Sequence, residues 1–202
     1  MVVRISKSVL IVAVMAFVLI CTAVNVVPVS SFFQQRNLPI VMYHQLTVKS
    51  EKSGKYVLTL EQFEKDLQYL KTKGYQTVSL KQLIDFSQGK GDIPEKAVMI
   101  TFDDGNETLY EYALPLLRKY GFTAVGFVIG ALADYYSEIN DHNLNYSYLN
   151  WSQIKEMANG NVIEIESHSY DLHKNNNARS GIKKKKTELQ EKISKMILDS
   201  DI

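Results

Sequence analysis

The stretch Val98-Met99-Ile100-Thr101-Phe102-Asp103-Asp104-Gly105 determines the fold that we expect. Its short apolar part is typical of a strand that is buried on both faces. Two adjacent carboxylates and a glycine follow, and burying two carboxylates together is unfavourable unless a cation compensates them. In α/β folds, catalytic and ligand-binding residues lie at strand ends that lead into helices. Taken alone, the stretch also fits a plain turn with a capping aspartate.

A second stretch, Glu166-Ser167-His168-Ser169-Tyr170-Asp171-Leu172-His173, favours the chemical interpretation. It follows another apolar, strand-like run at residues 161–165. We therefore expect two imidazoles just past one strand and two carboxylates just past another. Side chains in these positions can converge on one metal ion.

Strand-like and helix-like patterns alternate along the chain, which indicates parallel βα units. We expect strands at residues 39–43, 76–80, 97–101, 123–129 and 161–166. We expect helices from residue 59 to about residue 74 and at residues 81–88, 108–120, 151–159 and 187–198. Thr59 with Gln62 and Asn150 with Gln153 have the spacing of capping boxes. Residues 47–56 are predicted to be loop, and residues 130–150 a long linker.

Composition restricts the function and the kind of metal site. The formal net charge of +1 gives no electrostatic case for nucleic acid. The only cysteine, Cys21, lies in the N-terminal apolar segment. Neither a disulfide framework nor a cysteine zinc site is possible. Any metal ligands must therefore be histidines and carboxylates.

The N-terminal sequence is typical of an export segment. Arg4 and Lys7 precede an apolar run over residues 9–27, close to the length that spans a membrane. Either a cleaved signal or a retained anchor fits, and the length favours an anchor with its positive end inside. We expect a signal peptide or membrane anchor at residues 1–29, a tether at 30–38 and one domain at 39–202, outside the cytoplasm.

The candidate site residues form a consistent chemical set. If Asp104, His168 and His173 bind one divalent ion, positions remain open for water and substrate. Zn²⁺ is the first expectation, and Co²⁺, Ni²⁺ and Mn²⁺ remain open. Asp103 can take the proton of the attacking water as general base. This chemistry is amide or ester hydrolysis, and the spacing does not identify the carbonyl. His44 follows the first strand and fits either a structural or a site-lining role.

The tyrosines of residues 130–150 also have two interpretations. Tyr135, Tyr136, Tyr146 and Tyr148 can stack on sugar rings if they are exposed. They can equally pack this segment onto the body of the domain.

The two stretches together resemble the signatures of the polysaccharide deacetylases, the NodB-homology proteins of carbohydrate esterase family 4. Thr101-Phe102-Asp103-Asp104-Gly105 is similar to the first signature, and His168-Ser169-Tyr170-Asp171-Leu172-His173 to the second. The wide histidine spacing resembles the branch that deacetylates poly-N-acetylglucosamine, which favours such a matrix polymer over peptidoglycan as the substrate. Supporting matches are Ile40-Val41-Met42-Tyr43-His44, Leu114-Pro115-Leu116-Leu117 and Trp151-Ser152-Gln153-Ile154-Lys155.

The resemblance implies a distorted (β/α) barrel and a metal-dependent N-deacetylase of cell-surface or matrix glycans. It assigns Asp103 as the catalytic base and Asp104, His168 and His173 as metal ligands. His44 matches a residue near the site in the related branch, which suggests substrate binding.

The resemblance also predicts segments that this sequence does not contain. Family members carry a later Arg-Pro segment, an Asp-Trp segment and a Leu-x-His segment whose histidine is the general acid. All of them should follow Ile202, so we expect an incomplete barrel, a truncated chain and no general acid. A non-catalytic, membrane-tethered glycan-binding remnant is the alternative function. A metal-dependent hydrolase of another acyl or amide substrate is a third.

Overall fold

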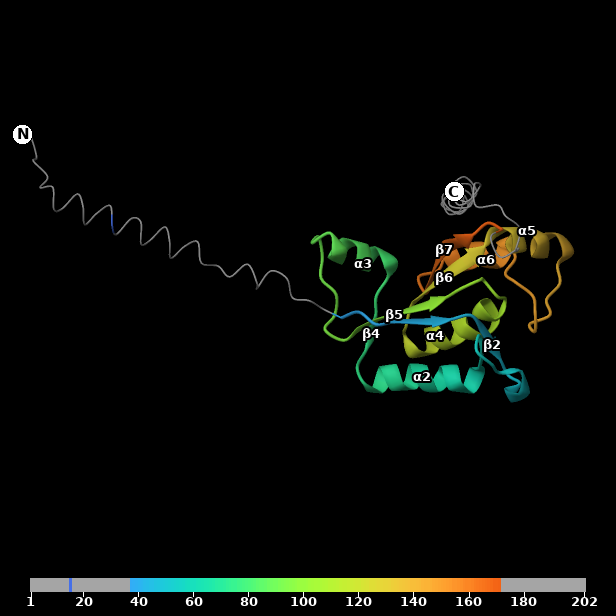
Figure 1. Ribbon diagram of the computed structural model, residues 1–202, viewed down its shortest axis with the longest axis horizontal. Helices are drawn as coiled ribbons and strands as arrows, with labels where there is room; N and C mark the ends of the chain where they lie inside the picture. The colour runs from blue at the N-terminus through green and yellow to red at the C-terminus, as the bar shows by residue number, and fades with distance from the viewer. Residues whose placement is uncertain (1–14, 16–36, 172–202) are drawn as a thin grey trace, which may run out of the picture. The chain divides into compact units, whose positions relative to one another are not determined.

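The computed structural model describes residue 15 and residues 37–171 (Figure 1). The backbone divides into two compact units, Met1–Asn37 and Leu38–Ile202. All elements described below belong to the second unit. Apart from residue 15, the predicted export segment lies outside the described residues, as do the helix predicted at residues 187–198 and His173. No helix within the described part of the chain is long and apolar enough to cross a membrane.

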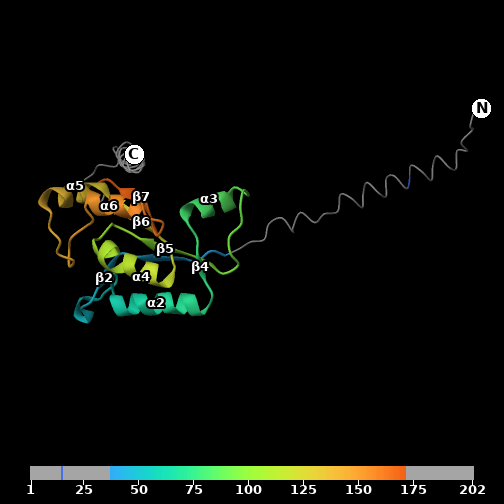
Figure 2. The same cartoon turned by 180° about the vertical axis from the view of Figure 1, so that it is seen from behind.

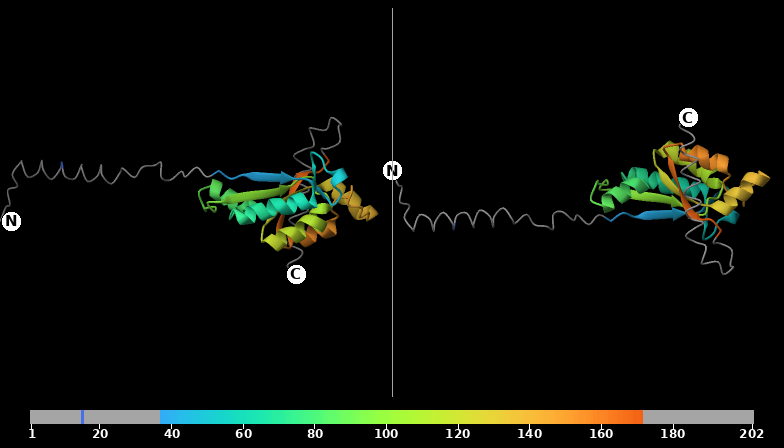
Figure 3. Two further views of the ribbon diagram at one scale, coloured as in Figure 1. Left: turned by 90° about the horizontal axis from the view of Figure 1, so that it is seen from below. Right: turned by 90° about the horizontal axis from the view of Figure 1, so that it is seen from above.

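A parallel sheet forms the centre of the second unit. Its five strands are β1 (Ile40–Tyr43), β4 (Gln76–Thr77), β5 (Ala97–Phe102), β6 (Ala124–Ile129) and β7 (Ile163–Ser169). The order is β1-β5-β6-β7, and β4 pairs with the first residues of β5. Every one of these pairings is parallel, and Figure 3 shows β1 and β5 running in the same direction. The expected α/β class is confirmed, and all five predicted strands are present.

The remaining elements connect and cover these strands. The helices are α2 (Leu60–Thr72), α3 (Leu80–Ser87), α4 (Leu114–Tyr120), α5 (Gly130–Ile139) and α6 (Trp151–Ala158). A 3₁₀ turn, η2 (Ser50–Lys52), and a π-helical turn, η3 (Leu109–Ala113), complete the helical segments. A second, two-stranded parallel sheet pairs β2 (Gln45–Thr47) with β3 (Val57–Thr59).

Strand β5 is central because all six of its residues are buried. Its side chains alternate between two hydrophobic clusters, as the period of two in a strand requires. Val98, Ile100 and Phe102 enter the larger cluster, together with residues of α2, α4 and α6. Ala97 and Met99 enter a smaller cluster with residues of α3. Figures 1 and 2 show α2 and α4 close together and α3 apart from them.

The helix N-termini follow the sequence signals only in part. Asn150 and Gln153 form a full capping box at α6, as predicted. The Thr59 side chain accepts the backbone N–H of Gln62 at α2. The Gln62 side chain, however, donates to Asp66 Oδ1 at 2.9 Å instead of returning to Thr59. The predicted capping box at α2 is therefore wrong, and a single N-cap bond remains.

Three other elements have boundaries that differ from those predicted. The strand predicted at residues 76–80 ends at Thr77, since Ser79 and Gln82 form a capping box that starts α3. The prediction that residues 130–150 are a linker is wrong for the first half, where α5 begins directly after β6. Strand β7 continues to Ser169, so His168 lies within a strand and not in the following loop.

A ring cluster joins α2 to the sheet and gives a test of the core. Phe63 of α2 is fully buried and packs edge-on against Tyr43 and Phe102, with ring centroids 5.0 and 5.5 Å away. We expect Phe63→Ala to lower the free energy of unfolding by about 3–5 kcal/mol. Tyr69 of the same helix is 59% exposed, so Tyr69→Ala should cost less than about 1 kcal/mol. Urea denaturation measures both, and equal losses would contradict this assignment of the core.

Candidate functional site

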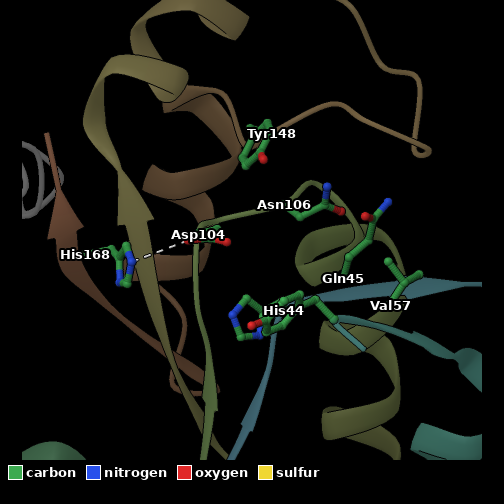
Figure 4. Close-up of a pocket in the computed structure, with 8 residues that line it drawn as sticks. His44, Gln45, Val57, Asp104, Asn106, Tyr148 and His168 are labelled. Carbon is green, nitrogen blue, oxygen red and sulfur yellow. Dashed lines mark ion pairs between the residues drawn. The ribbon is translucent and has the colours of Figure 1, made fainter. Parts of the chain in front are cut away.

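A cleft opens where the strands of the main sheet end (Figure 4). Its volume is about 460 Å³. The lining residues are His44, Gln45, Tyr56, Val57, Asp104, Asn106, Tyr148 and His168. They come from the ends of β1, β5 and β7, from the small sheet, and from the segment before α6. Parallel strands thus bring distant parts of the sequence to one edge, as α/β folds do at their sites.

The backbone turns sharply at the end of β5. Asp104 and Gly105 both have positive φ angles, 70° and 74°. Aspartate tolerates this conformation better than most residues, and glycine adopts it freely. A Cβ atom at Gly105 would lie 3.1–3.2 Å from the side chain and Cα of Val128 in β6. The turn therefore needs glycine for its conformation and for its close approach to β6.

A neighbouring segment clamps this turn. Leu149 donates its backbone N–H to the Gly105 carbonyl at 2.9 Å, and Glu107 donates to the Ser147 carbonyl at 2.9 Å. Asn106 and Tyr148 form an isolated antiparallel bridge between these two bonds. The clamp brings the Tyr148 side chain to the cleft.

Asp104 and His168 lie together in the cleft. Asp104 Oδ1 is 3.4 Å from His168 Nε2, and the two side chains are 26% and 29% exposed. The alternation of β7 explains the position of His168, because Ile163, Ile165, Ser167 and Ser169 are buried on the opposite face. This pair has the donor types that a divalent ion takes. No group of three histidine, cysteine or acidic residues that could hold a metal occurs within residues 37–171.

The other predicted site residues are placed differently. His44 lines the cleft, and its ring lies 4.9 Å from that of Tyr56. Asp103 is half-buried, and its N–H donates to the Tyr43 carbonyl at 2.9 Å. Asp103 is not among the residues that line the cleft.

Several lining residues were not singled out from the sequence. Gln45, Tyr56, Val57 and Asn106 carry no pattern of their own, although Asn106 directly follows the first signature. Of the four tyrosines noted in residues 130–150, only Tyr148 lines the cleft. Tyr136 is buried, whereas Tyr135 and Tyr146 are exposed.

Burial affects the ionisation of the cleft wall. Burial raises the pKa of the Tyr148 phenol above its ordinary value, and the negative charge of Asp104 raises it further. Tyr148 therefore keeps its proton at neutral pH and can donate a hydrogen bond. Its ring also lies 5.8 Å from that of Tyr136 in α5, which fixes this wall to the body of the domain.

The carboxylate of Glu107, two residues after Gly105, is buried. The Glu107 side chain is 1% exposed, and its Oε1 accepts from Gln153 Nε2 at 2.8 Å. The same oxygen lies 2.5 Å from Nδ1 of His142, which is 48% exposed. The hydrogen bond with Glu107, together with its charge, raises the pKa of His142. This pair ties residues 140–149 to the turn.

The turn gives a direct mutational test. We expect Gly105→Ala to lower the free energy of unfolding by at least about 2 kcal/mol, because a methyl group there is strained and contacts Val128. Gly54 has no atom within 4 Å of an added Cβ and no positive φ, so Gly54→Ala is the matched control. Urea denaturation of both variants tests this, and two equally small effects would contradict it.

The His142–Glu107 pair predicts a pH dependence. Because the folded state raises the pKa of His142, the pair stabilises the fold fully below the unfolded pKa of about 6.5. That stabilisation is lost as the pH rises through the folded-state pKa. The melting temperature of the wild type should exceed that of His142→Gln by more at pH 5.5 than at pH 8.5. An equal difference at both pH values would contradict the prediction.

The sequence of this chain is similar to those of known proteins. The family model described as polysaccharide deacetylase matches residues 90–200, which is more than half of the chain. A poly-beta-1,6-N-acetyl-D-glucosamine N-deacetylase of Staphylococcus epidermidis is 34% identical over 135 residues, covering 67% of this chain and 45% of that protein. One of Staphylococcus aureus is 35% identical over 133 residues, covering 64% and 44%. The chain therefore spans less than half the length of these relatives.

Solved structures give the same likeness. IcaB from Ammonifex degensii has a TM-score of 0.58 at 30% identity, covering 69% of this chain and 56% of that one. A de-N-acetylase from Aggregatibacter actinomycetemcomitans has a TM-score of 0.58 at 29% identity, covering 67% and 56%. The family match includes both stretches that carry the resemblance noted from the sequence. The chain belongs to the polysaccharide deacetylase family.

Proposed function

We propose that this chain acts in metal-dependent hydrolytic N-deacetylation of an extracellular polysaccharide that contains N-acetylglucosamine. The observation that carries the proposal is the meeting of Asp104 and His168 in one cleft, although 64 positions separate them in the sequence. The names of the relatives, which are N-deacetylases of poly-beta-1,6-N-acetyl-D-glucosamine, support the deacetylase over a glycan-binding remnant.

The separation of the two side chains suits a shared metal ion. At 3.4 Å, Asp104 Oδ1 and His168 Nε2 are too far apart for a strong hydrogen bond. Two ligands at ordinary distances from a tetrahedral Zn²⁺ ion lie roughly 3.4 Å from each other. We assign His173 as the third ligand. Zn²⁺ is our first choice, and Co²⁺, Ni²⁺ and Mn²⁺ suit the same donors.

Each of the assigned residues has a separate role in the reaction. Asp104, His168 and His173 hold the ion, which when bound polarises the acetyl carbonyl and lowers the pKa of water. Asp103 acts as general base and takes a proton from the water that attacks this carbonyl. The amide nitrogen takes up a proton from solvent as the carbon–nitrogen bond breaks, and acetate and the free amine leave. Asp103 is covalently next to Asp104, so a change in backbone conformation at the turn would affect both roles.

The substrate and the location follow from two further features. The four-residue gap between His168 and His173 is the spacing that favoured poly-N-acetylglucosamine over peptidoglycan. The basic and apolar N-terminal sequence supports export, with the membrane as a partner. The polymer and the domain would then meet outside the cytoplasm.

Acetate release tests the proposal. Incubation of the 202-residue protein and Zn²⁺ with β-1,6-linked N-acetylglucosamine oligomers should release acetate, and a chelator should stop the release. Asp103→Asn should lower kcat by about 10²–10⁴-fold while the protein still binds metal. Asp85→Asn, on α3, is the matched control and should retain activity.

Two outcomes would contradict the proposal in different ways. A folded wild-type protein that releases no acetate would contradict the activity. An Asp103→Asn variant as active as the wild type would remove the assigned base. Measuring the metal content of Asp104→Asn separates ligand loss from base loss, because only this variant should lose the metal.

A further inference from the structure

Two carboxamide side chains, Gln45 and Asn106, line the cleft and are labelled in Figure 4. They come from β2 and from the turn after β5, and they lie on the side of the cleft away from His168 in that view. Neither has a place in the proposed hydrolysis. Their hydrogen bonds to the rest of the protein determine what each side chain offers to a ligand.

The orientation of the Asn106 amide is determined by Thr108. Oδ1 of Asn106 accepts the Thr108 backbone N–H at 3.1 Å and the Thr108 hydroxyl at 2.7 Å. The hydroxyl donates there, because an amide oxygen can only accept, and Thr108 Oγ1 in turn accepts the backbone N–H of Leu46 at 3.0 Å. A backbone N–H can only donate, so the oxygen of Asn106 must face Thr108. Its Nδ2 remains as a donor, and Asn106 as a whole is only 5% exposed.

The orientation of the Gln45 amide is determined in the opposite sense. Nε2 of Gln45 donates to the backbone carbonyls of Leu144 and Asn145 at 3.2 and 3.0 Å. A carbonyl can only accept, so the nitrogen must face these residues. Its Oε1 remains as an acceptor. Within the described part of the chain, no hydrogen bond joins Gln45 to Asn106.

We infer that Gln45 Oε1 and Asn106 Nδ2 recognise an acetamido group of the glycan. A secondary amide offers one carbonyl acceptor and one N–H donor, and this pair presents one donor and one acceptor in return. A free amine has no carbonyl, so it would leave the Asn106 donor unpaired, which is how polar sites discriminate between ligands. Gln45 and Asn106 are thus positioning residues for an acetylated sugar. The inference rests on the proposed function and specifies which sugar the cleft prefers.

The fixed orientations allow a sharp test. Asn106→Asp keeps an oxygen for both Thr108 bonds and replaces the donor with a second oxygen, which an acetyl carbonyl cannot pair with. Calorimetry on the 202-residue protein should measure the affinity for a β-1,6-linked N-acetylglucosamine tetramer and for the corresponding glucosamine tetramer. We expect Asn106→Asp to lower the preference for the acetylated tetramer by at least about tenfold, equivalent to one lost hydrogen bond.

Controls separate recognition from folding and from added charge. Asn161 is exposed, precedes β7 at the other end of the sheet, and its Asn161→Asp variant should keep the wild-type preference. Asn106→Ala removes the donor without adding charge, and should lower the preference in the same direction if Asn106→Asp fails to fold. Thr108→Ser keeps the orienting hydroxyl and should retain the preference.

Each result has one meaning. If Asn106→Asp and Asn106→Ala are folded and keep the wild-type preference, the inference is wrong and the proposed function stands. If the wild type binds the acetylated tetramer through Asn106 but releases no acetate from it, the proposed function is wrong and the inference stands. A wild-type protein that does not prefer the acetylated tetramer overturns the inference directly.

Discussion

The backbone turn at Asp104 and Gly105 lies against Val128, and the geometry of the cleft depends on this contact. Positive φ at two successive residues reverses the chain at once after β5, so that a carboxylate is presented at the strand end. The contact with β6 prevents the turn from moving outward. The clamp from Ser147 and Leu149 holds it from the other side. These contacts fix the direction in which the turn presents the Asp104 carboxylate.

The residues that line the cleft come from two parts of the fold. Asp104 and His168 lie at the ends of two strands of one sheet, where backbone pairing fixes their separation. Gln45, Asn106 and Tyr148 lie on segments that hydrogen bonds tie to one another. Under the proposed function, variation of these segments would change which glycan binds while the chemistry at the strand ends stays the same.

Much of this arrangement was predictable from local patterns. The apolar runs identified all five strands of the main sheet, and the capping signals identified the start of α6. The length of β7 was not predictable, because Ser167 and Ser169 are buried although serine is typical of loops. Helix α5 was missed because Ile129 gives its N-terminus no side-chain cap.

One part of the site was predictable, because the carboxyl ends of parallel strands meet at the same edge of a sheet. The pairing of Asp104 with His168 follows from that rule alone. Asn106 and Gln45 were not predictable, since the role of a carboxamide depends on which of its atoms the fold has already engaged. Thr108 determines this for Asn106, and the carbonyls of Leu144 and Asn145 determine it for Gln45 from about 100 positions away in the sequence.

The clamp between Gly105 and Leu149 also constrains the order of assembly. A ribosome releases the turn well before it releases the segment that holds it, 44 positions later in the sequence. His168 follows later still. All residues of α2, β1 and β5 precede residue 103, so the core that they form can assemble before the clamp residues 147–149 are available. Completion of the cleft is therefore among the last steps of folding for this part of the chain.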